Sequence, residues 1–488
     1  MSQSVPNRSW SYLSTQELTI ATSSDETKAS RLNIVRLAPG DRQLELQWQY
    51  EGAERSGDIK YEIQWSALNE ERNAGTLQLP GSANGTVVRN LDHAKDYRIL
   101  IKVISDGTGA ILAVSPIRLF RTGEVPGTVV NYIHPEDYTY NYSGRSTASP
   151  SLVHLPDGAW IASHDVFWGN GGQNVTKLFR SEDMGKTWTF LCDLYPCFWG
   201  KLFLHRERLY MLGTSTEYGS LLIGRSDDGG RTWSAPSDLL PAGSREQGGP
   251  HKAPMPVVEH QGRLWTAVEH GSWRIGGHAT GVVSVPADAD LLDPAQWSVT
   301  PFLKYDKGWP GTIEGGEKPS LLEGNVVITP DNRLVNLLRY HTKGGHPEYG
   351  RAILLHVDDQ DPSAPLTFGS VIDFHGNMAK FTIHYDPMTG RYWSLVNRVT
   401  TANTSQRNIL SLVSSADLAH WQLHQDVLNY EDNGWPEDST KVGFQYVDWQ
   451  IEGPHIRFLS RTAINGAYNY HNANYITFHT IENFRDCL

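Results

Sequence analysis

The chain of 488 residues has few cysteines, no long apolar run and fewer basic than acidic side chains. Its three cysteines, an odd number, cannot form a disulfide framework, so we expect three reduced thiols. No run of about eighteen apolar residues occurs, which argues against a membrane-spanning helix. The formal net charge of −12 argues against nucleic acid or an acidic membrane as a partner.

Signals of export and of cofactor binding are also missing. Residues 1–10 contain no apolar signal core, which favours a cytoplasmic protein, although a secreted chain that has lost its leader looks the same. Residues 1–28 are polar and rich in Ser and Thr, and predict a loosely ordered arm. No His-Glu-x-x-His pattern, phosphate loop or dinucleotide fingerprint is found, so we expect neither a metal nor another cofactor.

Turn-forming and aromatic residues, in contrast, are abundant. The chain has 45 Gly, 26 Pro, 16 Trp and 21 Tyr. This mixture is typical of many short strands joined by tight turns, with aromatic side chains wedged between sheets. The composition therefore predicts an all-β protein.

Residues 29–123 show the alternation of half-buried strands, as in residues 44–48, 61–65 and 97–103. Trp48, and Leu91 followed six residues later by Tyr97, resemble the fibronectin type III pattern. In that family the Trp fills the core between two sheets and the Tyr hydroxyl bonds to backbone. The resemblance implies an immunoglobulin-like β-sandwich over residues 29–123, in which we expect no chemistry.

Two octapeptides, residues 181–188 and 226–233, obey the same rule, Ser-x-Asp-x-Gly-x-Thr-Trp. In each, the Asp can bond its own turn, the Gly supplies positive φ and the Trp packs between neighbouring sheets. Their spacing is the length of one four-stranded propeller blade. The octapeptide resembles the Asp-box, or BNR repeat, of sialidase-superfamily propellers.

That resemblance implies a six-bladed β-propeller of four-stranded antiparallel blades over residues 124–488. Each inner strand should run into a turn and a second apolar strand, and residues 128–133 should complete the last blade and close the ring. The expected inner strands begin near six residues: Ser149, Lys201, Lys252, Glu323, Lys380 and Gln445.

Polar and ionisable residues gather where inner strands begin and second strands end, which is one face of such a ring. This concentration predicts a ligand site. Its positive side chains suggest an acidic oligosaccharide, with sialic or uronic acid, unless they only balance neighbouring carboxylates. The predicted substrate-binding residues are Arg145, Lys201, His251, Lys252, Glu269, Arg339, Lys380 and Arg461.

The sialidase resemblance implies an exo-acting glycoside hydrolase. Glu323 would take the proton of Tyr446, whose oxygen attacks the anomeric carbon, and Asp165 or His164 would protonate the leaving oxygen. Lys380 stands where the family has an arginine, which puts sialic acid itself in doubt. The structural alternatives are an aromatic lining of the channel for Tyr446 and a loop hydrogen bond for His164.

Two other functions remain open at this point. A polysaccharide lyase acting on a uronate, such as a rhamnose-glucuronate linkage, would use His164 and His251 as base and acid, with Tyr446 in support. A propeller can also bind glycans without catalysis. The sequence specifies neither the sugar nor the oligomeric state.

Overall fold

The computed structural model describes residue 10 and residues 31–68, 74–169 and 171–488. The expected arm over residues 1–28 therefore lies outside the described residues, apart from Trp10. Strands dominate, as the composition predicts, and the few helices are single 3₁₀ turns. None of the helices within the described ranges is long and apolar enough to cross a membrane.

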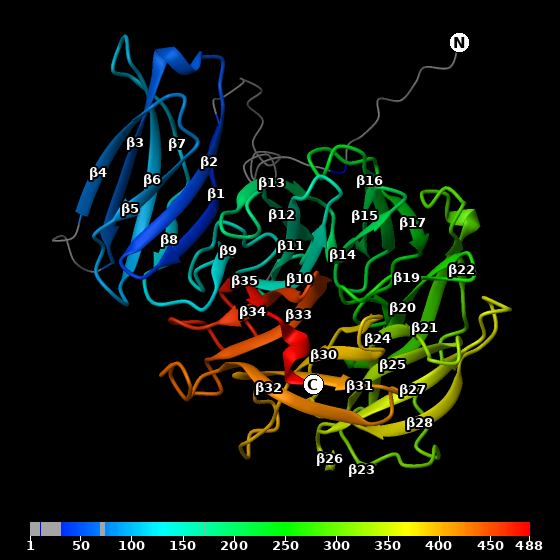
Figure 1. Ribbon diagram of the computed structural model, residues 1–488. Helices are drawn as coiled ribbons and strands as arrows, with labels where there is room; N and C mark the ends of the chain where they lie inside the picture. The colour runs from blue at the N-terminus through cyan, green and yellow to red at the C-terminus, as the bar shows by residue number, and fades with distance from the viewer. Residues whose placement is uncertain (1–9, 11–30, 69–73, 170) are drawn as a thin grey trace, which may run out of the picture.

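The first strands form two antiparallel sheets that face each other (Figure 1). One sheet has the order β1 (Arg31–Gly40), β2 (Gln43–Glu51), β5 (Gly85–Arg89). The other has the order β4 (Ala74–Pro80), β3 (Ile59–Ala67), β6 (Asp96–Ser105), β7 (Ile111–Val114), and β8 (Arg118–Arg121) also pairs with β6.

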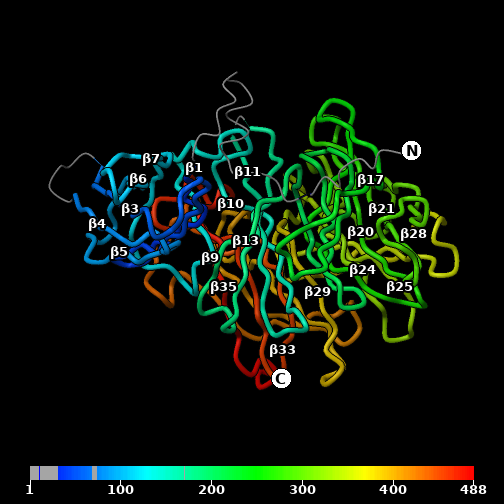
Figure 2. The backbone as a smooth tube through the Cα atoms, turned by 90° about the horizontal axis from the view of Figure 1, so that it is seen from above, coloured from blue at the N-terminus to red at the C-terminus, as the bar shows by residue number. Residues whose placement is uncertain are grey.

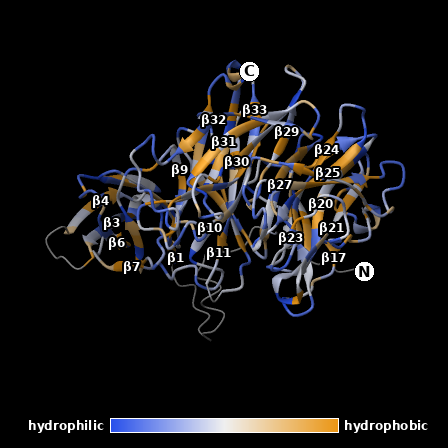
Figure 3. Ribbon diagram, turned by 90° about the horizontal axis from the view of Figure 1, so that it is seen from below, coloured by the Kyte–Doolittle hydropathy of each residue, from blue (hydrophilic) through white to orange (hydrophobic). Residues whose placement is uncertain are grey.

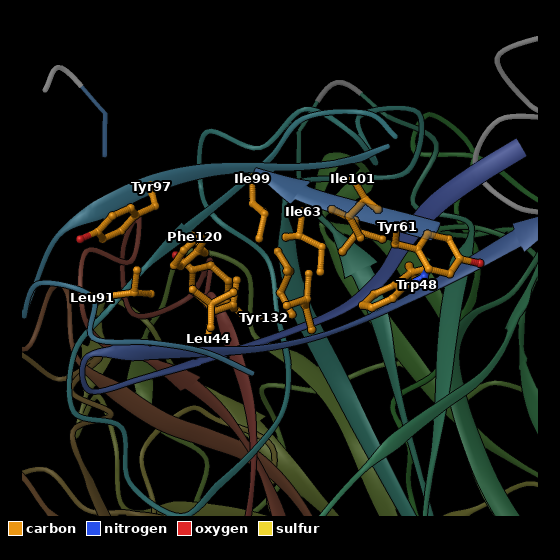
Figure 4. Close-up of a cluster of buried hydrophobic side chains, with 14 of the residues drawn as sticks. Leu44, Trp48, Tyr61, Ile63, Leu91, Tyr97, Ile99, Ile101, Phe120 and Tyr132 are labelled. Carbon is orange, nitrogen blue, oxygen red and sulfur yellow. The ribbon is translucent and has the colours of Figure 1, made fainter. Parts of the chain in front are cut away.

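Aliphatic and aromatic side chains together fill the space between these two sheets (Figure 4). Trp48 and Tyr61 pack edge to face with ring centroids 5.2 Å apart. The Tyr97 hydroxyl accepts a hydrogen bond of 2.9 Å from the backbone N–H of Asp92. Both the central Trp and the Tyr bond to backbone therefore occur where the sequence pattern placed them.

Residues 128–481 form six further antiparallel sheets, drawn in chain order from green to red in Figure 1. The first sheet comprises β10 (Ser146–His154), β11 (Trp160–Phe167), β12 (Val175–Ser181) and β13 (Thr189–Leu194), and the second comprises β14 (Phe198–His205), β15 (Arg208–Thr214), β16 (Leu221–Ser226) and β17 (Ser237–Leu240). In the third sheet, β18 (Gly249–His251) and β19 (Val258–His260) both pair with β20 (Arg263–Ser272), which is followed by β21 (Gly277–Pro286) and β22 (Ser298–Val299).

The remaining three follow the same zigzag. They are β24 (Ser320–Ile328), β25 (Leu334–His341), β27 (Arg351–Val357), β28 (Thr367–Asp373); β29 (Ile383–Asp386), β30 (Arg391–Asn397), β31 (Ile409–Ser415), β32 (Trp421–Asn429); and β33 (Gly443–Glu452), β34 (His455–Ala463), β35 (Tyr475–Ile481), β9 (Thr128–Tyr132). A short pair, β23 (Glu314–Gly315) and β26 (Gly345–His346), lies outside them. The strands are mostly apolar and the connecting loops hydrophilic (Figure 3).

The six sheets close into a ring. β9, from the start of this region, pairs with β35 from its end, as the sequence predicts for residues 128–133. Side chain to backbone hydrogen bonds tie neighbouring sheets at the centre, for example Ser151 Oγ to Leu202 N and Asn325 Oδ1 to Ile383 N. These bonds hold the polar parts of the inner strands around one centre.

The N-terminal sandwich lies at one side of the ring, beside β9 (Figure 2). Tyr132 and Tyr475 of the ring belong to the sandwich core. Arg118 donates to Asp137 at 2.6 Å in a fully buried ion pair that joins the two parts. The boundaries at residues 29–123 and 124–488 remain a prediction, although strands of the two parts fall on either side of residue 124.

Both octapeptides form the expected turns. Asp183 accepts from Thr187 N at 2.8 Å, and Asp228 accepts from Thr232 N at the same distance. Gly185 has a φ of 83°, a left-handed value that a side chain would strain. The final Trp of each octapeptide is buried, so these turns anchor their sheets to the next.

Trp10 is packed deep in the ring. Its ring lies edge-on to Trp233 with centroids 6.1 Å apart, and its indole N–H donates to the carbonyl of Pro196 at 2.9 Å. A Cβ on Gly224 would come within 2.3 Å of this indole, so the glycine leaves room for it. Trp10 thus fills a gap between the first two sheets of the ring.

We predict that Trp10→Ala lowers the free energy of unfolding by about 3 kcal/mol, because it leaves a cavity beside Trp233 and an unpaired carbonyl. Urea unfolding followed by far-ultraviolet circular dichroism measures the change. Met388→Ala, at a side chain that is 77% exposed, serves as the control and should change stability little. Equal stability of the Trp10→Ala and wild-type proteins would show that Trp10 is not part of the packed ring.

Candidate functional site

Four of the six sheets carry the same irregularity at the same place. Between the inner and second strands, two residues oppose one, which is a β-bulge. The first residue of each bulge has a left-handed φ of 46° to 54°. These four bulge residues are Ser149, Trp199, Glu323 and Tyr446.

A left-handed φ is unfavourable for residues with a Cβ, and most of all for bulky ones. Such strain persists where the surrounding structure fixes it, and it is concentrated at functional sites. In two of these sheets the residue before the bulge pairs with an arginine: Leu322 with Arg339, and Gln445 with Arg461. The bulges therefore turn one residue per sheet to the centre, beside the end of the second strand.

Glu323, Arg339 and Tyr446 meet at this centre. Tyr446 donates its hydroxyl hydrogen to Glu323 Oε1 at 2.9 Å. Arg339 Nη1 lies 2.9 Å from Glu323 Oε2 and 3.0 Å from the Tyr446 oxygen. Glu323 and Arg339 are buried and Tyr446 is half-buried, so the phenol is the most exposed member of this triad. We call the surroundings of the Tyr446 hydroxyl the mouth of the ring.

Two further guanidinium groups lie over the Tyr446 ring. The Cζ atom of Arg461 is 5.1 Å and that of Arg407 is 5.5 Å from the ring centroid. Arg407 is fixed by a hydrogen bond to Gln445, and Arg461 by one to the carbonyl of His471. Sequence reasoning predicted Arg461 but missed Arg407, which precedes β31 in a loop and lies outside the repeat that identified the rim.

Burial and charge act against each other in this group. Burial alone would raise the pKa of Glu323, but Arg339 outweighs it and holds that pKa below its ordinary value. Burial and the Glu323 carboxylate raise the pKa of Tyr446, while the three arginines oppose the rise. Glu323 is therefore an anion that accepts a hydrogen bond from a neutral phenol, and this 2.9 Å bond is the path along which a proton can pass between the two oxygens.

Asp165 lies close enough to Arg461 for their charges to interact, but its hydrogen bonds go to other groups than the triad. Its carboxylate is fully buried and accepts from Thr176 Oγ1 at 2.6 Å and from Trp199 N at 2.8 Å. Burial raises its pKa to about 7. Because its acceptors are occupied by the backbone and a hydroxyl, the geometry favours a positioning role for Asp165 over contact with a leaving group.

His164 also lies away from the mouth. Adjacent residues of β11 point to opposite faces, and His164 is stacked on Phe179 with a ring nitrogen 2.9 Å from Asn131 Nδ2. Burial lowers its pKa to about 3, so it stays neutral. The structure gives His164 the hydrogen-bonded, structural environment that was the alternative to an acid.

His251 occupies the rim of the third sheet. Its Nδ1 lies 3.1 Å from Glu269 Oε2, and Glu269 also accepts from the backbone N–H of Gly324. The Gly324 bond links this pair to the residue that follows Glu323. His251 and Glu269 are therefore held next to the Tyr446 cluster, as the rim pattern predicted.

The three predicted lysines lie deeper along the inner strands. Lys201 follows the second bulge and its Nζ lies 2.5 Å from Asp448 Oδ2. Lys380 donates to Thr382 Oγ1 and to the carbonyl of Val447, and Lys252 donates to Thr266 and Ala267. Burial lowers the pKa of Lys252 to about 7 and that of Lys380 to about 8. The lysines line the buried centre beneath the mouth.

Arg145 lies farther out. Its guanidinium stacks on the ring of Tyr138 at 4.8 Å, and Tyr138 is 61% exposed. In the described part of the chain, no group of three His, Cys, Asp or Glu residues is arranged to hold a metal ion.

No protein-family model matches the sequence, and no curated protein matches it either. Among solved structures, the α-L-arabinanase of Penicillium chrysogenum with arabinobiose is similar over 74% of this chain and 98% of that chain, at 12% identity and a TM-score of 0.46. The α-L-arabinofuranosidase of Fusarium graminearum with arabinobiose covers the same shares, at 11% identity and a TM-score of 0.46.

An exo-1,5-α-L-arabinanase from a bovine ruminal metagenomic library is similar over 59% of this chain and 92% of that chain, at 11% identity and a TM-score of 0.36. The sialidase relationship remains a prediction from the motifs.

The buried lysines predict a pH dependence of stability. The folded pKa of Lys252 lies below the value of about 10.4 for an exposed lysine, so the native state holds fewer protons than the unfolded state between these values. The free energy of unfolding should therefore rise with pH, and Lys252→Met should remove about 2 kcal/mol of that rise between pH 7 and pH 9.

Urea unfolding at both pH values tests this expectation. Lys186→Met, at an exposed lysine, is the matched control and should leave the pH dependence of the wild-type protein unchanged. The interpretation fails if Lys252→Met and Lys186→Met show the same dependence on pH.

Proposed function

We propose that the protein is a glycoside hydrolase that cleaves the bond next to an acidic sugar, with Tyr446 as nucleophile and Glu323 as its base. The observation that carries this proposal is the Tyr446 hydroxyl, 2.9 Å from Glu323 and 3.0 Å from Arg339, with two more arginines over its ring. We interpret the six sheets as propeller blades and residues 31–121 as a fibronectin-like sandwich. The cytoplasm remains the predicted compartment.

In the first step, Tyr446 transfers its proton to Glu323 and its oxygen forms a bond to the anomeric carbon as the bond to the leaving oxygen breaks. Arg339 stabilises the phenolate that develops. Water then attacks the same carbon and gives its proton to the group that protonated the leaving oxygen, while Tyr446 leaves and takes its own proton back from Glu323. Two displacements at one carbon retain its configuration.

The charges of the mouth favour an anionic substrate. Three guanidinium groups surround Tyr446, and Glu323 forms an ion pair with one of them, Arg339. Excess buried positive charge is costly unless an anion shares it, and planar guanidinium groups bind carboxylates in two-point fashion. This excess exists in a chain whose formal net charge is −12, so it is a local feature. A sugar carboxylate, sialic or uronic, suits this position.

The leaving oxygen needs a proton donor. Asp165 and His164 were predicted for this role, but their hydrogen bonds face the interior of the sheets. His251, 8% exposed and paired with Glu269, is the alternative in the mouth. The hydrogen bond to Glu269 orients the His251 ring, and we assign the proton donor to His251.

The pair of His251 and Glu269 also favours a second candidate function, that of a uronate lyase. There His251 or Tyr446 would take the proton next to the sugar carboxylate, and the arginines would stabilise the enolate. Hydrolysis adds water to the products, whereas a lyase leaves an unsaturated sugar that absorbs in the ultraviolet. Mass analysis and absorbance of the same reaction separate the two.

A panel of sialic and uronic acid oligosaccharides tests the function. We expect turnover with a gain of one water, and Tyr446→Phe or Glu323→Gln should lower kcat by about 1,000-fold or more, because each removes the nucleophile or its base. Tyr470→Phe is the matched control, since it removes a hydroxyl from the tyrosine on the other side of Arg407 and should keep activity.

Arg407→Lys should raise KM for the acidic substrate about tenfold, since lysine cannot bind a carboxylate in two-point fashion. Glycan binding without turnover that survives Tyr446→Phe and Glu323→Gln would instead identify a binding protein. No turnover and no binding across the panel would overturn the acidic-sugar proposal.

A further inference from the structure

Trp199 occupies the bulge position of the second sheet, equivalent to Glu323 and Tyr446. In all three sheets the bulge residue has a left-handed φ, which is 52° at Trp199. The residue two places later, Lys201, is equivalent to Asn325 and Asp448 by register. The inner strands therefore turn Trp199 to the same centre that receives the proposed base and nucleophile.

The backbone of Trp199 is actively held in this conformation. Its N–H donates to Asp165 of the first sheet at 2.8 Å, and Thr176 donates to the other oxygen of that carboxylate. A bulky side chain with positive φ is a true outlier, and such strain is kept where neighbouring groups impose it. Asp165 is thereby a positioning residue for Trp199.

The Trp199 ring is half-buried and lies against the proposed proton donor. Its centroid is 4.3 Å from that of His251, and Tyr218 meets its edge at 5.9 Å. Phe198 also packs against the indole, with ring centroids 4.9 Å apart, and because the side chain is only half-buried, part of it stays exposed. A group that receives a proton from His251 must lie beside this ring.

A chain of rings continues from His251 towards Arg339. His278 lies 4.7 Å from His251, Trp273 lies 4.9 Å from His278, and His341 lies 4.7 Å from Trp273. Within the described chain, neither ring nitrogen of His278 has a hydrogen-bond partner, although this side chain is 96% buried, its exposed fraction being 4%. This row of rings lines the part of the centre formed by the third and fourth sheets, and the His278 nitrogens are buried within it.

The mouth thus has two chemically different sides. Arg407 and Arg461 present positive charge over Tyr446, where an acidic sugar fits, whereas Trp199 and His251 present rings. Sugars expose an apolar C–H face that packs on aromatic rings, with hydroxyls at their edges for polar partners.

We propose that Trp199 is the stacking platform for the leaving sugar, which is a neutral pyranose attached to the acidic sugar. This inference rests on the proposed function, because the leaving oxygen is the atom that His251 protonates. The substrate class is then an acidic sugar linked to a neutral pyranose with an open C–H face. Asp165 acts through Trp199, and we assign it no contact with substrate.

Two substrates separate this role from a general loss of activity. One is the best acidic disaccharide from the panel, and the other is the fluoride of the same acidic sugar, which needs no proton and carries no second ring. We expect Trp199→Ala to lower kcat/KM by about 10- to 100-fold on the disaccharide and by less than about twofold on the fluoride.

Trp199→Phe should retain most of the activity on the disaccharide, since phenylalanine keeps a flat ring. Trp309→Ala is the control, because Trp309 stacks on Phe368 at the outside of the ring of sheets. Thermal unfolding must show that each variant is folded. Equal losses on the two substrates, or no loss on either, would overturn the platform.

Binding without turnover distinguishes the two proposals. Titration of Tyr446→Phe and of Tyr446→Phe/Trp199→Ala with the acidic disaccharides measures how much Trp199 contributes to binding, even if no hydrolysis occurs. If the double variant binds the disaccharide more weakly than Tyr446→Phe does, and the wild-type protein shows no hydrolysis, the platform is supported and the hydrolase proposal is not. Equal binding to both variants would overturn the platform, whatever the wild-type protein catalyses.

Discussion

The backbone at four equivalent bulges determines what the centre of this ring can do. Inserting one residue into an inner strand gives the first bulge residue a left-handed φ and turns its side chain to the axis. Because the sheets share one centre, residues 123 positions apart in the chain, Glu323 and Tyr446, meet within a hydrogen bond. Without the bulge the alternation of the strand would send these side chains into the packing between sheets.

The closed ring allows so much charge to be buried. Asp448 accepts from Lys201 Nζ, Ser151 Oγ and Leu152 N, and so ties the last sheet to the first two. Each of these bonds crosses between sheets, so the charges stabilise the ring that brings them together. The lysines without a carboxylate partner instead have lowered pKa values, which reduces the charge that must be buried.

The repeat in the sequence explains which parts of the site could be predicted. Glu323, Arg339 and Tyr446 each lie at a defined position of a repeated strand pair, and one rule applied to successive blades located them. The same rule could not choose between Asp165 and His164, because neighbouring residues of a strand point to opposite faces of its sheet. Here both faces are covered by other parts of the protein, so both side chains are buried and hydrogen-bonded there. Arg407 follows no repeat, and only the polar run 406–408 before an apolar strand marks its position.

The bulges also explain why Trp199 was not recognised from the sequence. A tryptophan near the start of an apolar strand is usually a core residue, and pattern reasoning selected Lys201, two positions later, as the rim residue. The inserted residue shifts the register by one, so the aromatic side chain turns to the centre and the lysine lies deeper. The rings of Trp199 and His251 and the guanidinium groups over Tyr446 then lie around one centre. Under the two proposals, charge would select the acidic sugar and ring shape would select the leaving sugar.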